Sequence, residues 1–233
     1  MSRNGEVYML GKRPNAILFD LDGTLLDTAP DLGHALNRVL ADSNRPLKEL
    51  IELRPYASHG SHGLLKLGFG DDYNELNRTQ LRQQFLDYYE QRVCVDTTLF
   101  AEVEELLQTL SQQQIPMAIV TNKPTLYTQL VLREIPALAR LPVVVCGDTL
   151  SVAKPDPAPL LHACALLSAH YQYPIEAQHA LYVGDAERDI EAGRRAGMRT
   201  VLASYGYIAA HDDVQAWRAD FAIAQPSQLL DLW

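Results

Sequence analysis

Two carboxylates separated by one residue, Asp20 and Asp22, directly follow a short apolar segment, residues 16–19. In open α/β sheets, ligands bind at the carboxyl ends of strands, where these side chains are expected to lie. One carboxylate there can act as a nucleophile and the other as a proton donor to a leaving oxygen. Gly23 lets backbone amides approach a phosphoryl group. The alternative is an acidic turn in which both aspartates bond nearby amides.

Residues that can bind an anion follow a second apolar segment, residues 117–120. Thr121 and Asn122 precede Pro124, and proline is favoured in the first turn of a helix. Both residues can therefore donate hydrogen bonds to a phosphate near a helix N-terminus. Considered alone, Thr121 is better explained as an ordinary helix cap.

A lysine and two aspartates in the second half of the chain complete the charged candidates. Lys154 lies in a proline-containing turn, residues 153–157, that can hold a cation beside a phosphate. A solvated loop lysine is the alternative. Asp185 and Asp189 follow another apolar segment, and their spacing lets them share one face of a helix start and hold Mg²⁺ directly or through water. Here the alternative is a helix cap and a solvated aspartate.

The elements that would position these residues are predicted from apolar patterns. Short continuous apolar segments, each ending in a polar or glycine-containing turn, are typical of strands buried on both faces. They cover residues 16–19, 117–120, 143–146, 180–183 and 200–203, and a possible edge strand covers residues 221–224, before a short helix near Pro226. Helical patterns lie between them, which predicts an α/β fold with a doubly wound parallel sheet.

The alternation of strand and helix fails between Asp27 and Asp96. Apolar stripes at helical spacing run through residues 32–40 and 81–88, and no buried strand is predicted there. This predicts a helical insertion, residues 28–95, with hinges near residue 28 and residues 95–97. Residues 1–27 and 96–233 would form the sheet domain.

Composition narrows the class of protein. With 233 residues, 47% of them hydrophobic, the chain can build one large core and a smaller subdomain. A net charge of −9, without any Lys/Arg-rich block, disfavours nucleic acid and anionic membranes as partners. No apolar run is long enough to span a membrane, and three scattered cysteines suggest neither disulfides nor zinc. A soluble cytoplasmic protein is expected, either a monomer or a homodimer.

The four motifs occur in the order, and at the strand ends, of the haloacid-dehalogenase (HAD) superfamily, which the chain resembles over nearly its whole length. The likeness is greatest to the phosphoglycolate phosphatase branch and rests on residues 19–28, 121–124, 154–157 and 184–197. The resemblance implies a Rossmann-like core with an inserted α-helical cap. It also implies Mg²⁺-dependent hydrolysis of small phosphomonoesters through a phospho-aspartate.

The resemblance also implies a role for each core residue. Asp20 would be the nucleophile and a metal ligand. Asp22 would be the general acid and then the general base, and would bind the metal through its backbone carbonyl. Thr121 and Lys154 would hold the phosphoryl oxygens, and Lys154 would also offset the charge of Asp20.

Further metal ligands and a substrate loop follow from the same resemblance. Asp185 would complete the metal shell, and Asp189 would bind the metal through water or orient its ligands. In the cap, residues 54–63 resemble a glycine-containing substrate loop. Arg54, His59 and Lys66 would meet the non-phosphate end of an anionic substrate, although Lys66 fits a solvated cap surface equally well.

Several functions remain open. A phosphatase is expected first, with 2-phosphoglycolate as its first substrate and N-acetylmuramic acid 6-phosphate as the alternative. A mutase similar to β-phosphoglucomutase would also need Asp20 and Asp22 and would differ only in its products. A haloacid dehalogenase is disfavoured, because it needs no metal and lacks the acid that Asp22 supplies. A protein that only binds phosphometabolites would be more attractive if a motif residue were missing, and none is.

Overall fold

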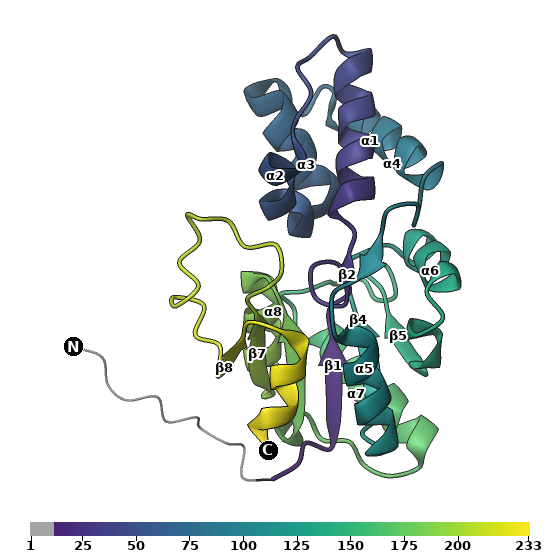
Figure 1. Cartoon of the computed structure of the whole chain (residues 1–233), viewed down its shortest axis with the longest axis vertical. Helices are drawn as coiled ribbons and strands as arrows, with labels where there is room; N and C mark the ends of the chain where they lie inside the picture. The colour runs from purple at the N-terminus through teal and green to yellow at the C-terminus, as the bar shows by residue number, and fades with distance from the viewer. Residues whose placement is uncertain (1–11) are drawn as a thin grey trace, which may run out of the picture.

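The structure is a computed structural model that describes residues 12–233. A sheet of six parallel strands, in the order β5-β4-β1-β6-β7-β8, forms its core (Figure 1). The strands are β1 (Ala16–Phe19), β4 (Met117–Val120), β5 (Val143–Val145), β6 (Ala180–Gly184), β7 (Arg199–Ala203) and β8 (Phe221–Ile223). Each predicted strand is present within one residue at either end, so the α/β fold with a parallel sheet is confirmed.

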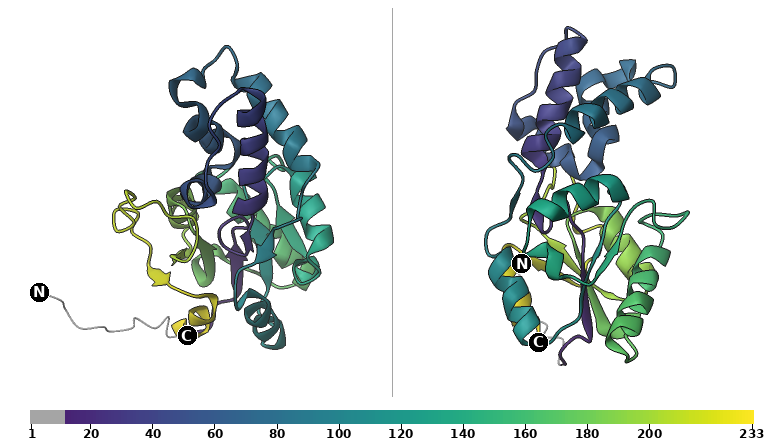
Figure 2. Two further views of the ribbon diagram at one scale, coloured as in Figure 1. Left: turned by 45° about the horizontal axis from the view of Figure 1, so that its top comes forward. Right: turned by 90° about the vertical axis from the view of Figure 1, so that its right-hand side faces the viewer.

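Helices cover both faces of the sheet, as Figure 2 shows, because β1 is apolar on both sides. Ile17 and Phe19 join the apolar cluster under α5, whereas Ala16 and Leu18 join the cluster under α7 on the opposite face. The covering helices are α5 (Val103–Gln112), α6 (Thr125–Glu134), α7 (Ala158–Tyr171), α8 (Glu187–Arg195) and the 3₁₀ helix η5 (Pro226–Leu232). Among residues 12–233, no helix combines the length and apolarity needed to cross a membrane.

A group of helices lies above the carboxyl ends of the strands (Figure 1). They are α1 (Ala29–Asp42), α2 (Leu50–Leu53), η1 (Arg54–His59), α3 (Gly60–Phe69), η2 (Gly70–Asp72) and α4 (Arg78–Glu90). Leu36 of α1 and Phe85 of α4 are fully buried in an apolar cluster of their own. We call this group the cap. Its treatment as a separate domain, residues 28–95, stays a prediction.

The chain enters and leaves the cap through a short antiparallel ribbon of β2 (Leu26–Asp27) and β3 (Thr98–Leu99). Nearby, the buried carboxylate of Asp31 accepts hydrogen bonds from the backbone N–H groups of Asp96 and Thr97 at 2.9 to 3.1 Å. The Thr97 hydroxyl donates to the same carboxylate at 2.8 Å. These contacts tie the returning chain to the start of α1 at the place where hinges are predicted.

Candidate active site

Asp20 follows the central strand β1, and its backbone N–H donates to Val183 O of the neighbouring strand at 2.8 Å. The parallel sheet therefore presents its carboxylate at the carboxyl edge, where it is only 2% exposed. A cavity of about 570 Å³ lies between this edge and the cap. Asp20, Asp22, Thr121 and Asn122 line it from the sheet side.

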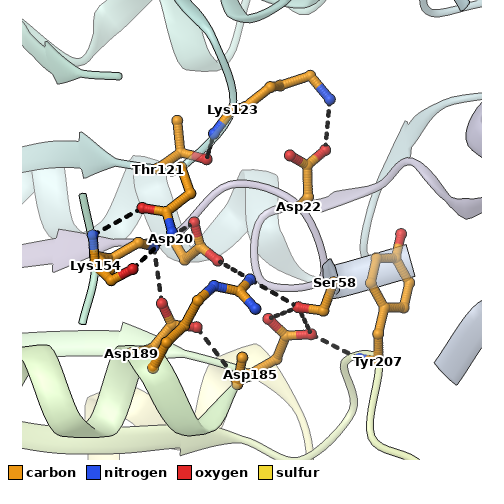
Figure 3. Close-up of polar contacts among 12 residues, drawn as sticks. Asp20, Asp22, Ser58, Thr121, Lys123, Lys154, Asp185, Asp189 and Tyr207 are labelled. Atoms are coloured by element: carbon orange, nitrogen blue, oxygen red, sulfur yellow. Dashed lines mark hydrogen bonds and ion pairs between the residues drawn. The ribbon is translucent and has the colours of Figure 1, made fainter. Parts of the chain in front are cut away.

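The ammonium group of Lys154 is enclosed by oxygen atoms (Figure 3). Its Nζ lies 2.8 Å from Asp20 Oδ1 and 2.8 Å from Asp189 Oδ1. It also donates to Val120 O at 2.9 Å and to the Tyr182 hydroxyl at 2.7 Å. The cation is thus fixed beside Asp20, as predicted. The contact of Tyr182 could not be predicted, because in sequence this residue looks like any other in a buried strand.

Three buried carboxylates form a cluster that can bind a metal ion. Asp20, Asp185 and Asp189 each offer an oxygen, and these atoms lie within 4.8 Å of one another. Burial and then the charges of Asp189 and Asp20 raise the pKa of Asp185 to about 8. Among the described residues, the buried Asp20 Oδ1 receives no hydrogen bond of good geometry, despite its ion pair with Lys154. Hard oxygen ligands that repel one another in this way suit a divalent cation such as Mg²⁺.

Both carboxylate oxygens of Asp189 have polar partners within the protein. One carboxylate oxygen accepts the N–H of Ala186 at 3.0 Å, and the other lies against Lys154. Burial opposes its ionisation, but Lys154 and Arg188 hold the pKa of Asp189 below its ordinary value. These contacts favour its role as an orienting group or a ligand through water, which stays a prediction.

Gly23 is required by the close approach of Asp185. Its φ of +88° is unfavourable for residues with a side chain, and a Cβ there would lie 2.1 Å from Asp185 Oδ2. The turn after β1 therefore accepts only glycine while Asp185 keeps its position. The predicted approach of a phosphoryl group to the backbone at Gly23 stays a prediction.

Asp22 points away from the carboxylate cluster toward Lys123, a residue that was not predicted as functional (Figure 3). Lys123 Nζ donates to Asp22 Oδ1 at 2.9 Å and lies 4.8 Å from the ring centroid of Tyr89 in cap helix α4. Burial opposes its charge, but Asp22 holds the pKa of Lys123 above its ordinary value. The second aspartate is therefore held by a buried cation. The only sequence signal for Lys123 was its place beside Asn122.

Thr121 is buried in the predicted position, whereas Asn122 differs from the simplest expectation. The Asn122 side chain donates to Lys154 O at 2.9 Å and accepts the Lys154 N–H at 3.0 Å. It therefore joins two loops, which leaves its backbone N–H for the predicted contact with phosphate. Helix α6 begins at Thr125, so Pro124 is the residue before the helix and not part of its first turn.

Two of the three cap residues lie where predicted. His59 and Lys66 line the cavity, and Lys66 also pairs with Asp71 at 3.0 Å. Burial and then Arg188 lower the pKa of His59, so its imidazole is neutral at neutral pH. His59 can therefore offer a hydrogen bond to a ligand but not a positive charge.

The position of Arg54 differs from the prediction that it contacts the substrate. Its guanidinium pairs with Asp27 and lies 5.8 Å from the ring centroid of Tyr207, and it does not line the cavity. The Tyr207 hydroxyl donates to Asp27 at 2.9 Å. The predicted substrate contact of Arg54 fails because a nearer carboxylate, in the linker between β1 and the cap, already binds the guanidinium.

Ser58, Arg82 and Arg188 line the cavity and were not predicted. Ser58 Oγ lies 3.2 Å from both carboxylate oxygens of Asp185, so a cap side chain reaches the carboxylate cluster (Figure 3). Arg188 stands in the same segment as the predicted metal ligands, and Ser58 stands beside His59. Both were near recognised motifs, but neither residue type signals a function by itself.

Comparison with known families and relatives agrees with this geometry. A family model described as haloacid dehalogenase-like hydrolase matches residues 17–203. The chain is 42% identical over 216 residues to a phosphoglycolate phosphatase from Xanthomonas campestris pv. campestris, covering 93% of this chain and 95% of the relative. It is 35% identical over 220 residues to an N-acetylmuramic acid 6-phosphate phosphatase from Pseudomonas aeruginosa, covering 94% and 95%.

A solved structure extends the comparison to three dimensions. The crystal structure of a predicted phosphoglycolate phosphatase from Haemophilus somnus 129PT superposes with a TM-score of 0.81 at 27% sequence identity. The match covers 95% of this chain and 98% of the other, so it includes both the sheet and the cap.

Proposed function

Because the chain belongs to the haloacid dehalogenase-like hydrolase family and is a phosphatase, we propose that Asp20 is the nucleophile that attacks its phosphorylated substrates. The proposal is supported above all by the position of Asp20, which follows the central strand, lines the cavity and pairs with the buried Lys154 at 2.8 Å. Burial and then the charge of Asp189 raise the pKa of Asp20 above its ordinary value, whereas Lys154 and Arg188 act in the opposite direction and favour the ionised carboxylate.

Asp20 and Asp22 have separate roles in the proposed reaction. An oxygen of Asp20 attacks phosphorus while the ester oxygen leaves with a proton from Asp22, which gives a phospho-aspartate. Asp22 then accepts a proton from water as the water oxygen attacks phosphorus, which releases phosphate and restores Asp20. Lys123 holds the Asp22 side chain between these steps.

The phosphoryl oxygens are held by groups around Asp20. Thr121 and the backbone N–H of Asn122 donate from one loop, and Lys154 supplies positive charge from another. Mg²⁺, held by Asp20, Asp185 and the Asp22 backbone carbonyl, would supply further positive charge where charge develops during phosphoryl transfer. The raised pKa of Asp185 and the crowding of carboxylates support this choice of cation.

The substrate is a small phosphorylated metabolite that carries a carboxylate. 2-Phosphoglycolate is the first candidate, since the relative that is 42% identical bears the name phosphoglycolate phosphatase. N-Acetylmuramic acid 6-phosphate is favoured by the cavity, because about 570 Å³ far exceeds the needs of a two-carbon acid. Phe85, Leu86 and Tyr127 line it and can pack against a sugar ring, while Arg82 can bind a carboxylate.

One screen separates these candidates. Purified protein with Mg²⁺ is offered a panel that includes both compounds and p-nitrophenyl phosphate, and free phosphate is measured. We expect kcat/KM to be highest for a carboxylate-bearing metabolite, and Asp20→Asn to lose turnover of every substrate while it keeps a native circular dichroism spectrum. Sugar bisphosphate or isomerised sugar phosphate among the products, in place of free phosphate, would indicate a mutase. Turnover by Asp20→Asn would refute the proposed nucleophile.

A further inference from the structure

Arg188 occupies an unusual position for an arginine of a helix first turn. It is the second residue of α8, yet its side chain is only 20% exposed and lines the cavity together with Asp20. Its Nη2 lies 3.9 Å from Asp20 Oδ2, the oxygen on the side opposite the one that faces Lys154. A second cation therefore approaches the nucleophile from its other oxygen.

Most hydrogen-bond donors of this guanidinium are unused. An arginine carries five N–H donors in a fixed plane. Among the described residues, its only side-chain hydrogen bond is from Nη2 to Ser58 Oγ at 3.1 Å, because 3.9 Å to Asp20 is too long for one. A largely buried guanidinium with free donors beside a reactive carboxylate is a receptor for an anion that the cavity admits.

Ser58 holds the guanidinium from the cap. Its hydroxyl has one hydrogen, which can be donated to Asp185 at 3.2 Å while its oxygen accepts from Arg188. The three side chains come from the cap segment η1, the residue that follows β6 and the start of α8. The cap thus reaches into the core at the position of Arg188.

We propose that Arg188 is a catalytic residue that binds the non-bridging oxygens of the phosphoryl group on Asp20, and that Ser58 is a positioning residue which aims it. This inference rests on the proposed function of Asp20. A phosphoryl group bonded to Asp20 Oδ2 brings its oxygens within hydrogen-bond range of Arg188. The planar guanidinium can then bind two of these oxygens at once, as charge spreads over the phosphoryl group in the transition state. The cap completes the phosphoryl site through Ser58.

Kinetics with two substrates distinguish this role from recognition of the rest of the metabolite. Arg188→Leu should lower kcat/KM about a hundredfold, by the same factor for the preferred metabolite and for p-nitrophenyl phosphate, since both present the same phosphoryl group. Arg188→Lys should retain part of the activity, because lysine keeps the positive charge but lacks the paired N–H donors of the planar guanidinium. Arg194→Leu, an exposed position on the same helix, is the matched control and should be unaffected. A loss confined to the metabolite would overturn the proposal.

Binding of inorganic phosphate supplies a readout that does not need turnover. With Mg²⁺ present, calorimetry should show phosphate affinity at least about tenfold weaker in Arg188→Leu and several-fold weaker in Ser58→Ala. In the double variant, Ser58→Ala should add nothing to the loss, because Ser58 acts through Arg188. Arg188→Lys keeps the test valid if the leucine variant does not fold.

Two results would contradict the assignment. Unchanged phosphate affinity in folded Arg188→Leu and Arg188→Lys would remove the contact. If the Arg188 variants need less Mg²⁺ for activity and bind phosphate as the wild type does, Arg188 only neutralises the aspartates. Either result leaves Asp20 as the nucleophile, whereas turnover by Asp20→Asn would reject the proposed function itself.

Discussion

At the scale of single residues, two aspartates that are almost adjacent in sequence meet different surroundings. Asp20 is buried against Lys154 and belongs to the carboxylate cluster. Asp22 lies outside that cluster and is bound by Lys123 at the cavity wall. A nucleophile and a proton-transfer group need such different environments, because one must stay ionised and the other must change its protonation during each cycle.

This division predicts a dependence on the leaving group. Asp22→Asn should lower kcat at least about a hundredfold for an alkyl phosphate, whose leaving oxygen needs a proton. For p-nitrophenyl phosphate, the first step needs little help from an acid, so release of nitrophenolate should suffer less than release of phosphate. Stopped-flow measurement of both products tests this. Equal and small losses for both substrates would remove Asp22 from proton transfer.

The acidic residues could be predicted because they follow buried strands, and a parallel sheet brings the carboxyl ends of its strands together. Lys154 could be predicted because it lies in a proline-containing turn. It could not place charged side chains of the cap in the same way. The charge of Arg54 predicts a contact with an anionic substrate, yet Asp27 binds its guanidinium. Arg188 was missed because an arginine in the first turn of a helix usually faces solvent, and only the fold shows that it turns back toward Asp20.

At the scale of elements, the loop between β7 and β8 joins the carboxylate cluster to the cap. The Tyr207 backbone N–H donates to Asp185 Oδ2 at 2.8 Å. Its hydroxyl accepts the N–H of Ala29, the first residue of α1, at 2.9 Å and donates to Asp27 at 2.9 Å. One residue thus links a candidate metal ligand to the linker from which the cap begins.

Tyr207→Phe should therefore weaken the fold without removing the contact to Asp185. The variant leaves the Ala29 N–H and the Asp27 carboxylate without this partner in a buried place, which should lower the free energy of unfolding by about 1–3 kcal/mol. Chemical denaturation measures the change. Tyr173→Phe, at an exposed hydroxyl, is the control. Equal stability of the two variants would show that the Tyr207 hydroxyl does not secure the linker.

Some elements were predictable and others were not. The six core strands could be located because each is a continuous apolar run of at least three residues between turns. Strands β2 and β3 escaped prediction, since two residues are too few to show any period. The stripes at residues 32–40 and 81–88 correctly located α1 and α4, whose apolar sides face the cap cluster.

At the scale of the whole molecule, the carboxylate cluster makes stability depend on pH and metal. The pKa of Asp185 is about 8 in the fold against an ordinary value of 3.8, because of burial and then of Asp189 and Asp20. Between these values the folded state binds more protons than the unfolded state, so stability falls as pH rises. Asp20, whose pKa is also raised, acts in the same direction. The lowered pKa of Asp189 acts only below 3.8.

In the absence of divalent metal, the melting temperature should therefore fall as pH rises from 3.8 toward 8. Saturating Mg²⁺ should raise it most at the upper end of this range, because the metal binds the ionised carboxylates. Differential scanning fluorimetry with a chelator or with Mg²⁺ checks both statements. Asp185→Asn should have a flatter pH dependence without metal, and Asp231→Asn, an exposed aspartate, should behave as the wild type. A slope in Asp185→Asn equal to that of the wild type would contradict this origin.

The covalent intermediate on Asp20 is the central step of the proposed mechanism, and trapping this intermediate tests the mechanism most directly. Asp22→Asn should form the phospho-aspartate from p-nitrophenyl phosphate faster than it hydrolyses it, because the second step needs Asp22 as a base. Acid quenching during turnover, followed by peptide mass spectrometry, should find the mass of one phosphoryl group on Asp20, with a burst of one nitrophenolate per active site. Turnover with Asp20 unmodified, or with the phosphoryl group on Asp185 or another residue, would contradict the account.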